Sequence, residues 1–178
     1  MLDRAGAAAA VEAPRRAEER TTTIDGPWRL ERRDPNALTL DFCRLKKGDG
    51  EFGEVIPVVA VQQILQEDDP YEGPITLEFV FDVESVPRSL RVVIEDADQY
   101  GIAVNGTSVA YDGLPYYVDR SFLPVDITSH VREGRNTIEL TREFRALKRP
   151  RFGLARLYAN VPGTEIESVY LVGDFATR

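Results

Sequence analysis

Apolar and polar residues alternate with a period of two along much of this chain. Between Ile75 and Val83 every second residue is apolar, while most of the residues between them are acidic or threonine. A period of two puts the apolar residues on one face of an extended strand and the polar residues on the other. The segment therefore predicts a strand with one packed face and one solvated face.

Comparable segments follow one another at short intervals. In the stretch 37–45, Leu38, Leu40 and Phe42 are expected to share one face of a strand. Many short strands separated by turns are typical of an antiparallel β-sandwich, so we expect an all-β fold of the jelly-roll type. The complete set of predicted strands covers residues 24–30, 37–45, 75–83, 89–95, 100–105, 137–144 and 165–175.

One segment has a helical period instead. Val58, Val61, Ile64 and Leu65 recur at helical spacing, and Pro57 stands at the opening turn. Proline is favoured at the first turn of a helix, so we expect a short helix over residues 57–66 that caps one end of the sandwich. A second helical turn is expected around residues 154–158.

The amino-terminal residues 1–23 are rich in Ala, Arg and Glu and nearly free of large apolar side chains. Such a segment buries too little surface to offset the entropy lost on ordering, so we predict a linker or disordered segment there. The β-sandwich domain is expected over residues 24–178, with Trp28, the only tryptophan, as a core or inter-sheet anchor.

The charge and composition of the chain indicate which classes of binding partner to exclude. The net charge is −8, which argues against nucleic acid because phosphate contacts need clustered Lys and Arg. No stretch reaches the roughly 20 apolar residues that cross a bilayer, so we expect no membrane partner. The composition does not distinguish an exported protein from a cytoplasmic one, and the localisation stays open.

Residues suited to catalysis or metal binding are sparse. Cys43 is the only cysteine and His130 the only histidine, so no zinc-ligand spacing exists, and we expect a buried, reduced thiol at Cys43. Glu95, Asp96 and Asp98 lie where a strand gives way to a turn, which favours a solvated loop over a catalytic carboxylate pair. We assign no catalytic residue and no cofactor, although loop aspartates could hold a structural calcium ion.

The segment from Tyr100 to Asn136 carries the most distinctive order of motifs. Asn105-Gly106 lies between apolar alternating runs, and both residues tolerate the positive φ of a tight turn, which predicts a β-hairpin. An aromatic loop, an Asp126-Ile127-Thr128 step and a Gly134-Arg135-Asn136 turn follow.

This order resembles the galactose-binding-like, sugar-binding β-sandwich domain of large glycoside hydrolases of the family 2-like and rhamnosidase-like type. The stretches NALTLDFCRL (36–45) and VYLVGDF (169–175) resemble the strands that open and close that domain. The matching residues of the central segment are Val104, Asn105, Gly106, Asp119, Phe122, Asp126, Ile127, Thr128, Gly134 and Asn136.

The resemblance implies a non-catalytic, carbohydrate-binding or accessory module of a larger bacterial glycoside hydrolase. Its partners would be carbohydrate and the catalytic domain of the parent chain, because a hydrolytic barrel of roughly 250 residues does not fit here. Two alternatives stay open. One is a purely structural interdomain β-sandwich with no ligand of its own, and the other, ranked last, is a free-standing glycosidase.

The loop Tyr111–Arg120 (YDGLPYYVDR) offers the residue types that bind sugars. Tyr116 or Tyr117 could stack on a pyranose ring, and Asp112, Asp119 and Arg120 could form hydrogen bonds with its hydroxyls. The same residues also suit a structural role, in which a tyrosine packs inward and Asp119 caps a turn. We favour the structural role for the individual side chains and retain the loop as the candidate ligand site.

Overall fold

The computed structural model describes residues 21–29, 31, 33–67, 69–146 and 163–177. The chain divides into two units, Met1–Arg32 and Arg33–Arg178. The described part of the first unit contains no helix or strand, and Trp28 is 72% exposed. The predicted strand at 24–30 and the anchoring role of Trp28 are therefore wrong. Pro27 has no N–H to give to a sheet, which disfavours a strand at this point.

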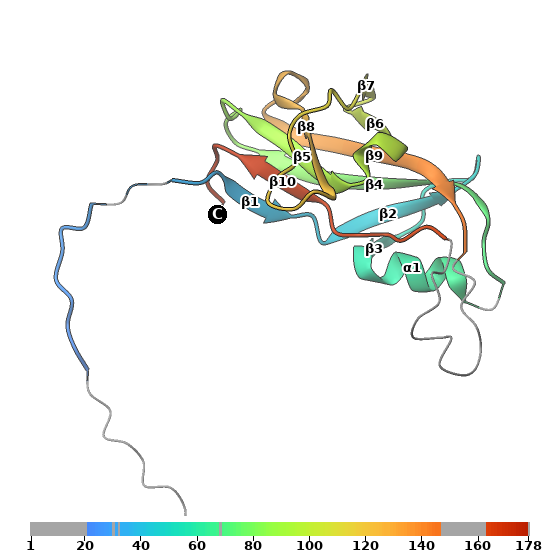
Figure 1. The fold of residues 1–178 in the computed structure, drawn as a ribbon, viewed down its shortest axis with the longest axis horizontal. Helices are drawn as coiled ribbons and strands as arrows, with labels where there is room; N and C mark the ends of the chain where they lie inside the picture. The colour runs from blue at the N-terminus through green and yellow to red at the C-terminus, as the bar shows by residue number, and fades with distance from the viewer. Residues whose placement is uncertain (1–20, 30, 32, 68, 147–162, 178) are drawn as a thin grey trace, which may run out of the picture. The chain divides into compact units, whose positions relative to one another are not determined.

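Two antiparallel sheets make up the described part of the second unit, which confirms the predicted all-β sandwich (Figure 1). The smaller sheet has the order β1 (Asn36–Thr39), β10 (Tyr170–Gly173), β5 (Leu90–Glu95) and β8 (Phe122–Asp126). The larger sheet has the order β3 (Val55–Pro57), β2 (Phe42–Lys47), β4 (Gly73–Val83), β9 (Gly134–Phe144), β6 (Gly101–Val104) and β7 (Thr107–Val109).

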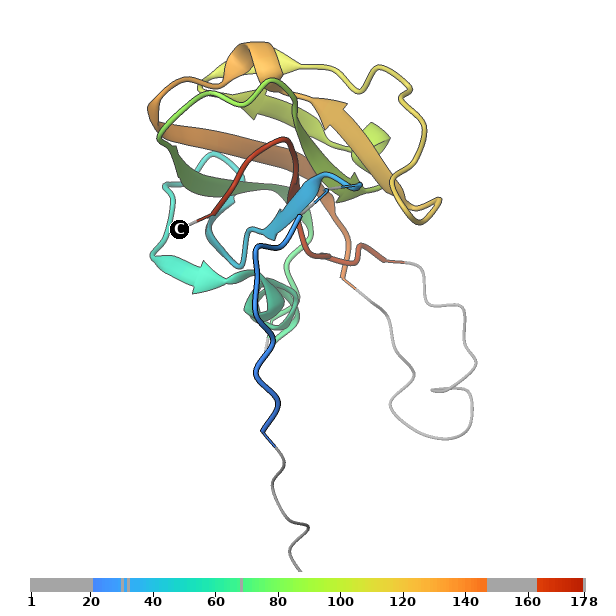
Figure 2. The same cartoon turned by 90° about the vertical axis from the view of Figure 1, so that its left-hand side faces the viewer.

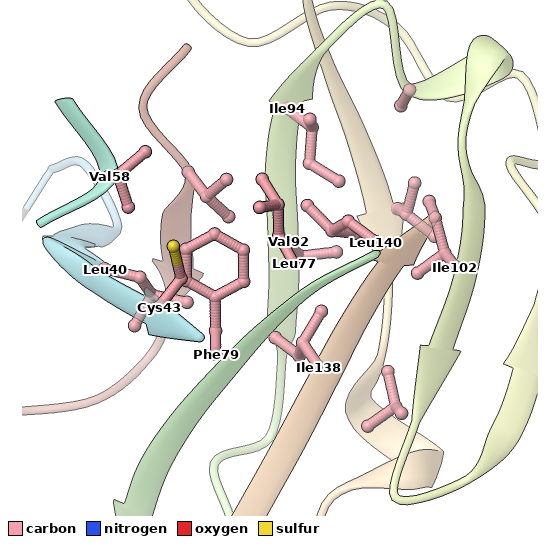
Figure 3. Packing of buried hydrophobic residues seen from close by; sticks show 14 of the residues in the cluster. Leu40, Cys43, Val58, Leu77, Phe79, Val92, Ile94, Ile102, Ile138 and Leu140 are labelled. Carbon is pink, nitrogen blue, oxygen red and sulfur yellow. The ribbon is translucent and has the colours of Figure 1, made fainter. Parts of the chain in front are cut away.

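The hydrophobic core lies between the sheets. On β4, Ile75, Leu77 and Phe79 are each at most 1% exposed, as their alternation predicts. Figure 3 shows Leu77 and Phe79 of the larger sheet gathered with Val92 and Ile94 of β5. Burial of such side chains stabilises the fold by about 1.5–3 kcal/mol each.

The strand predicted over residues 37–45 is in fact two strands in different sheets. The chain crosses between the sheets at Leu40 and Asp41, where the Leu40 N–H donates to the Val169 carbonyl over 2.8 Å. The crossing changes which residues face inward, so Phe42 is 59% exposed while Leu40 is 7% exposed. The prediction that Leu38, Leu40 and Phe42 share one face is therefore wrong at Phe42.

The predicted helix is confirmed as α1 (Val58–Gln66), which lies beside β2 and β3 (Figures 1 and 2). It buries Val58, Val61 and Leu65. Two short 3₁₀ helices, η1 (Ala97–Gln99) and η2 (Thr128–His130), occupy connections between strands. None of the described helices is long and apolar enough to cross a bilayer. The turn predicted at 154–158 lies outside the described residues, as does most of the predicted linker.

Candidate functional site

Asn105 and Gly106 form the two-residue turn between β6 and β7, so the predicted hairpin is confirmed. Val104 pairs with Thr107 across the turn. The backbone φ is 50° at Asn105 and 79° at Gly106, and positive values at both central residues are what a type I′ turn requires.

The Asn105 side chain also ties this turn to the next two elements. Its Nδ2 donates to the His130 carbonyl and to Asn136 Oδ1, each over 2.8 Å. Its Oδ1 accepts from the Thr137 N–H over 3.1 Å. Asn105 therefore does more than permit a backbone turn, because it joins the hairpin to η2 and to the start of β9.

Asn136 closes the turn that precedes β9. Its Oδ1 accepts from the Arg132 N–H over 2.9 Å, and its Nδ2 donates to the carbonyls of Arg132 and Gly134 over 2.7 and 2.9 Å. The side chain is fully buried, and buried amides of this kind need their partners. The Gly-x-Asn motif is thus a turn that the Asn136 side chain closes, and the same side chain accepts the hydrogen bond from Asn105.

The Asp126-Ile127-Thr128 step joins β8 to β5. The Thr128 N–H donates to Asp126 Oδ1 over 2.8 Å, and the hydrogen bonding from Thr128 holds the pKa of the Asp126 carboxyl below its usual value. The Thr128 hydroxyl contacts Leu90, accepting from its N–H over 2.9 Å and donating to its carbonyl over 3.2 Å. These motif residues therefore serve the architecture of the sandwich.

The candidate loop connects β7 of the larger sheet to β8 of the smaller one and stands out from the strands at the right of Figure 2. Asp119 Oδ1 accepts from the N–H and the hydroxyl of Ser121 over 3.0 and 2.9 Å, which lowers the pKa of Asp119. Asp119 thus caps a turn, as expected. Asp112 closes a separate turn, where its Oδ1 accepts from the Leu114 N–H over 3.4 Å.

Val118 holds an unusual conformation in this loop. Its φ is 62° and its side chain is 81% exposed. The Asp119 N–H donates to the Tyr117 carbonyl over 2.7 Å. The Tyr117 N–H in turn donates to the Phe122 carbonyl over 2.9 Å. A β-branched residue at positive φ is rare and costs about 1–3 kcal/mol. The turn is therefore strained, closed by hydrogen bonds and exposed.

The structure brings four of the five predicted ligand residues into or beside this strained turn. Tyr117 and Asp119 flank Val118, and Arg120 follows as an exposed side chain. Tyr116 precedes them and is 53% exposed, whereas Tyr117 is half-buried. Asp112 lies apart in its own turn.

Sequence reasoning missed a cleft of about 740 Å³ at another part of the sandwich. It is formed by β1, the end of β4, the β4–β5 connection and the residues that follow β10. The lining residues are far apart along the chain, so no local pattern marks them.

Neither the cysteine nor the acidic residues of the described chain form a second candidate site. Cys43 is 2% exposed, and burial raises the pKa of its thiol to about 11, which keeps it protonated at neutral pH. Among the described residues, no three His, Cys, Asp or Glu side chains gather so as to hold a metal ion.

No protein-family model matches the sequence, and no curated protein sequence is detectably similar to it. Solved structures share its fold. A β-glucuronidase from Ruminococcus gnavus superposes with a TM-score of 0.52 and 14% identity, over 83% of this chain and 30% of that chain. A rhamnosidase from Novosphingobium sp. PP1Y superposes with a TM-score of 0.51 and 18% identity, over 84% of this chain and 16% of that chain. A β-D-mannosidase from Dictyoglomus thermophilum superposes with a TM-score of 0.50 and 15% identity, over 78% of this chain and 22% of that chain.

At these identities the likeness shows the fold alone. This chain spans less than a third of each of the three solved chains. The predicted resemblance to a β-sandwich domain of large glycoside hydrolases is confirmed for the fold.

Proposed function

We propose that this chain is a non-catalytic accessory domain of a larger glycoside hydrolase and that it contacts carbohydrate through the loop Tyr111–Arg120. The observation that carries the contact is the strained turn at Val118. Strained backbone at an exposed position contributes nothing to core packing, and such strain concentrates at binding loops.

The turn presents side chains suited to a sugar. Tyr116 is 53% exposed, and its ring offers a flat apolar surface for the C–H face of a pyranose. An aspartate is ionised at neutral pH even at its ordinary pKa of 3.8, and the pKa of Asp119 is lower still, so its carboxylate can accept from hydroxyls. Arg120 supplies donors beside it.

A purely structural interdomain role is the second candidate, and one observation favours it. Phe42 on β2, Val55 on β3 and Val59 at the start of α1 are 59%, 65% and 82% exposed. Phe42 and Val55 come from paired strands and face outward together. Exposed apolar residues that lie together mark surfaces that pack against another domain.

Calorimetric titration of the purified chain with a panel of oligosaccharides tests the carbohydrate contact. We expect millimolar or tighter binding that Tyr116→Ala weakens about tenfold, the effect of losing one stacking ring. Val59→Ala, at an 82% exposed position on α1 outside the loop, is the control and should bind as the parent does. Failure of every oligosaccharide to bind would favour the structural role.

A further inference from the structure

The turn between β6 and β7 holds the only Asn-Gly pair of the chain, Asn105 and Gly106. Such a pair is chemically labile because the main-chain nitrogen of the glycine can attack the side-chain carbonyl carbon of the asparagine. Glycine has no Cβ to hinder this approach. A bond forms between the Gly106 nitrogen and Asn105 Cγ, the bond from Cγ to Nδ2 breaks, and ammonia leaves with the proton of the Gly106 N–H. Water then opens the cyclic imide, which gives aspartate or isoaspartate at position 105.

The folded turn engages both polar atoms of the Asn105 side chain elsewhere. Nδ2 donates to the His130 carbonyl and to Asn136 Oδ1, each over 2.8 Å, and Oδ1 accepts from the Thr137 N–H over 3.1 Å. The Asn105 N–H also donates to the Thr137 carbonyl over 2.9 Å. These partners belong to η2 and β9, and β9 lies beside β6 in the larger sheet (Figure 1). Rotation of the Asn105 amide towards Gly106 therefore breaks contacts with two other elements.

Gly106 itself is open to solvent. The residue is exposed, and a Cβ at this position would have nothing within 4 Å beyond the adjoining residues. Water, the second reactant, therefore reaches the turn. The hydrogen bonds of the Asn105 side chain, rather than a lack of water, hold the reaction back in the folded chain.

We propose that Asn105 is a latent deamidation site, which its hydrogen bonds keep closed and which reacts when the turn opens locally. The inference is independent of any contact with carbohydrate. Each hydrogen bond favours the closed turn by a net factor of about 2 to 10, so the three side-chain bonds together favour it roughly 10- to 1,000-fold. Because the reaction proceeds through the open turn, deamidation of the folded chain should be slower than that of the unfolded chain by a similar factor.

Deamidation should open the turn permanently. An aspartate at position 105 has no side-chain N–H to donate, so its carboxylate would face the His130 carbonyl and Asn136 Oδ1 as a third acceptor. An isoaspartate lengthens the main chain by one methylene, which a two-residue turn with Val104 paired to Thr107 does not accommodate. The reaction thus removes the contacts that had closed the turn, and the site acts as a one-way chemical switch.

Incubation of the intact chain at pH 8, in buffer and in urea, tests the proposal. Peptide-mapping mass spectrometry follows the mass increase at Asn105 as the amide nitrogen is replaced by oxygen, and an isoaspartate assay identifies the cyclic route. We expect the reaction in buffer to be at least about tenfold slower than in urea. Asn36 and Asn136, which precede Ala37 and Thr137, are internal controls and should stay intact in both samples.

Variants assign the protection to particular contacts. Asn136→Ala removes one acceptor of the Asn105 amide and should speed deamidation of the folded chain about two- to tenfold. Arg135→Ala, at an exposed neighbour, is the matched control and should react at the parent rate. A parent-like rate for Asn136→Ala would overturn the role of the hydrogen bonds.

The comparison of buffer with urea has two further outcomes. Equal rates in both would overturn protection by the fold, and the absence of reaction at Asn105 in urea would overturn the site itself. Should Asn136→Ala fail to fold, the parent chain in graded urea decides instead. Deamidation should begin below the urea concentration that unfolds the sheets, and deamidation that appears only with global unfolding would overturn local opening of the turn.

Discussion

The side-chain amide of Asn105 donates a hydrogen bond to the side-chain oxygen of Asn136 over 2.8 Å, which joins the β6–β7 turn to the start of β9. The Asn105 side chain also accepts from the Thr137 N–H, and the Asn136 side chain also accepts from the Arg132 N–H. The Asn-Gly and Gly-x-Asn motifs therefore work as one unit. Their order along the chain reflects contacts needed to assemble the sandwich.

Replacement of Asn136 by Ala should lower the free energy of unfolding by about 2–4 kcal/mol. The Arg132 N–H and the Asn105 amide would lose a buried acceptor, and each such loss costs about 1–3 kcal/mol. Urea denaturation measures the effect. Asn105→Gly, which keeps the positive φ but removes the side-chain bonds, should cost less, and Arg135→Ala at an exposed neighbour is the control. A cost for Asn136→Ala no larger than that control would contradict the linked-turn interpretation.

The predictions from sequence succeeded where the signal was local. The alternation of β4 and the Asn-Gly hairpin depend on neighbouring residues, and both were predictable. The break between β1 and β2 was not, because the apolar pattern runs through Leu40 without interruption. A long-range bond from Leu40 to Val169 fixes the crossing, and nothing near Leu40 in the sequence announces it.

The candidate ligand loop stays a prediction, and neither its backbone geometry nor the cleft was predictable from the sequence. Residue types indicated Tyr116 and Asp119, but the strain at Val118 was unpredictable because valine rarely adopts a positive φ. The cleft depends on Leu38 and Phe175, which the sheet order brings together from the two ends of the domain.

Asp126 should contribute a pH-dependent part of the stability. Hydrogen bonding from Thr128 lowers the pKa of the folded Asp126 carboxyl below its ordinary value of 3.8. The ionised carboxylate therefore stabilises the fold at pH values above 3.8. This contribution is lost as the pH falls from 3.8 through the lower, folded-state pKa. Asp126→Asn should be less stable than the parent at pH 7 by less than about 1 kcal/mol, since the group is exposed. The difference should shrink at pH 3. Urea denaturation at both values checks this, and a difference that stays constant with pH would refute it.

Cys43 should be unreactive in the folded protein. Its thiol is 2% exposed and has a pKa of about 11, so little thiolate exists at pH 8. Labelling with a disulfide reagent should be slow in buffer and fast in urea. The raised pKa also means that stability declines as the pH rises from the ordinary value of 9.0 towards 11, because the unfolded thiol ionises first. Cys43→Ala should lack this decline, and a decline of equal size in that variant would assign it to other groups.

Val118→Gly should stabilise the protein while weakening its contact with carbohydrate. Glycine adopts a φ of 62° without steric cost, so the variant should gain about 1 kcal/mol, reduced by the greater freedom of its unfolded chain. Val59→Gly, in the first turn of α1, is the matched control and should lose roughly 0.3–0.5 kcal/mol, because glycine has a lower helix propensity than valine. A looser turn at residue 118 holds Tyr116 less firmly, so oligosaccharide affinity should fall although the fold is more stable. Urea denaturation and calorimetry on the same samples separate the two effects. Urea denaturation of Val118→Ala gives the comparison. If Val118→Gly lowered the free energy of unfolding by as much as Val118→Ala does, the turn would hold no strain.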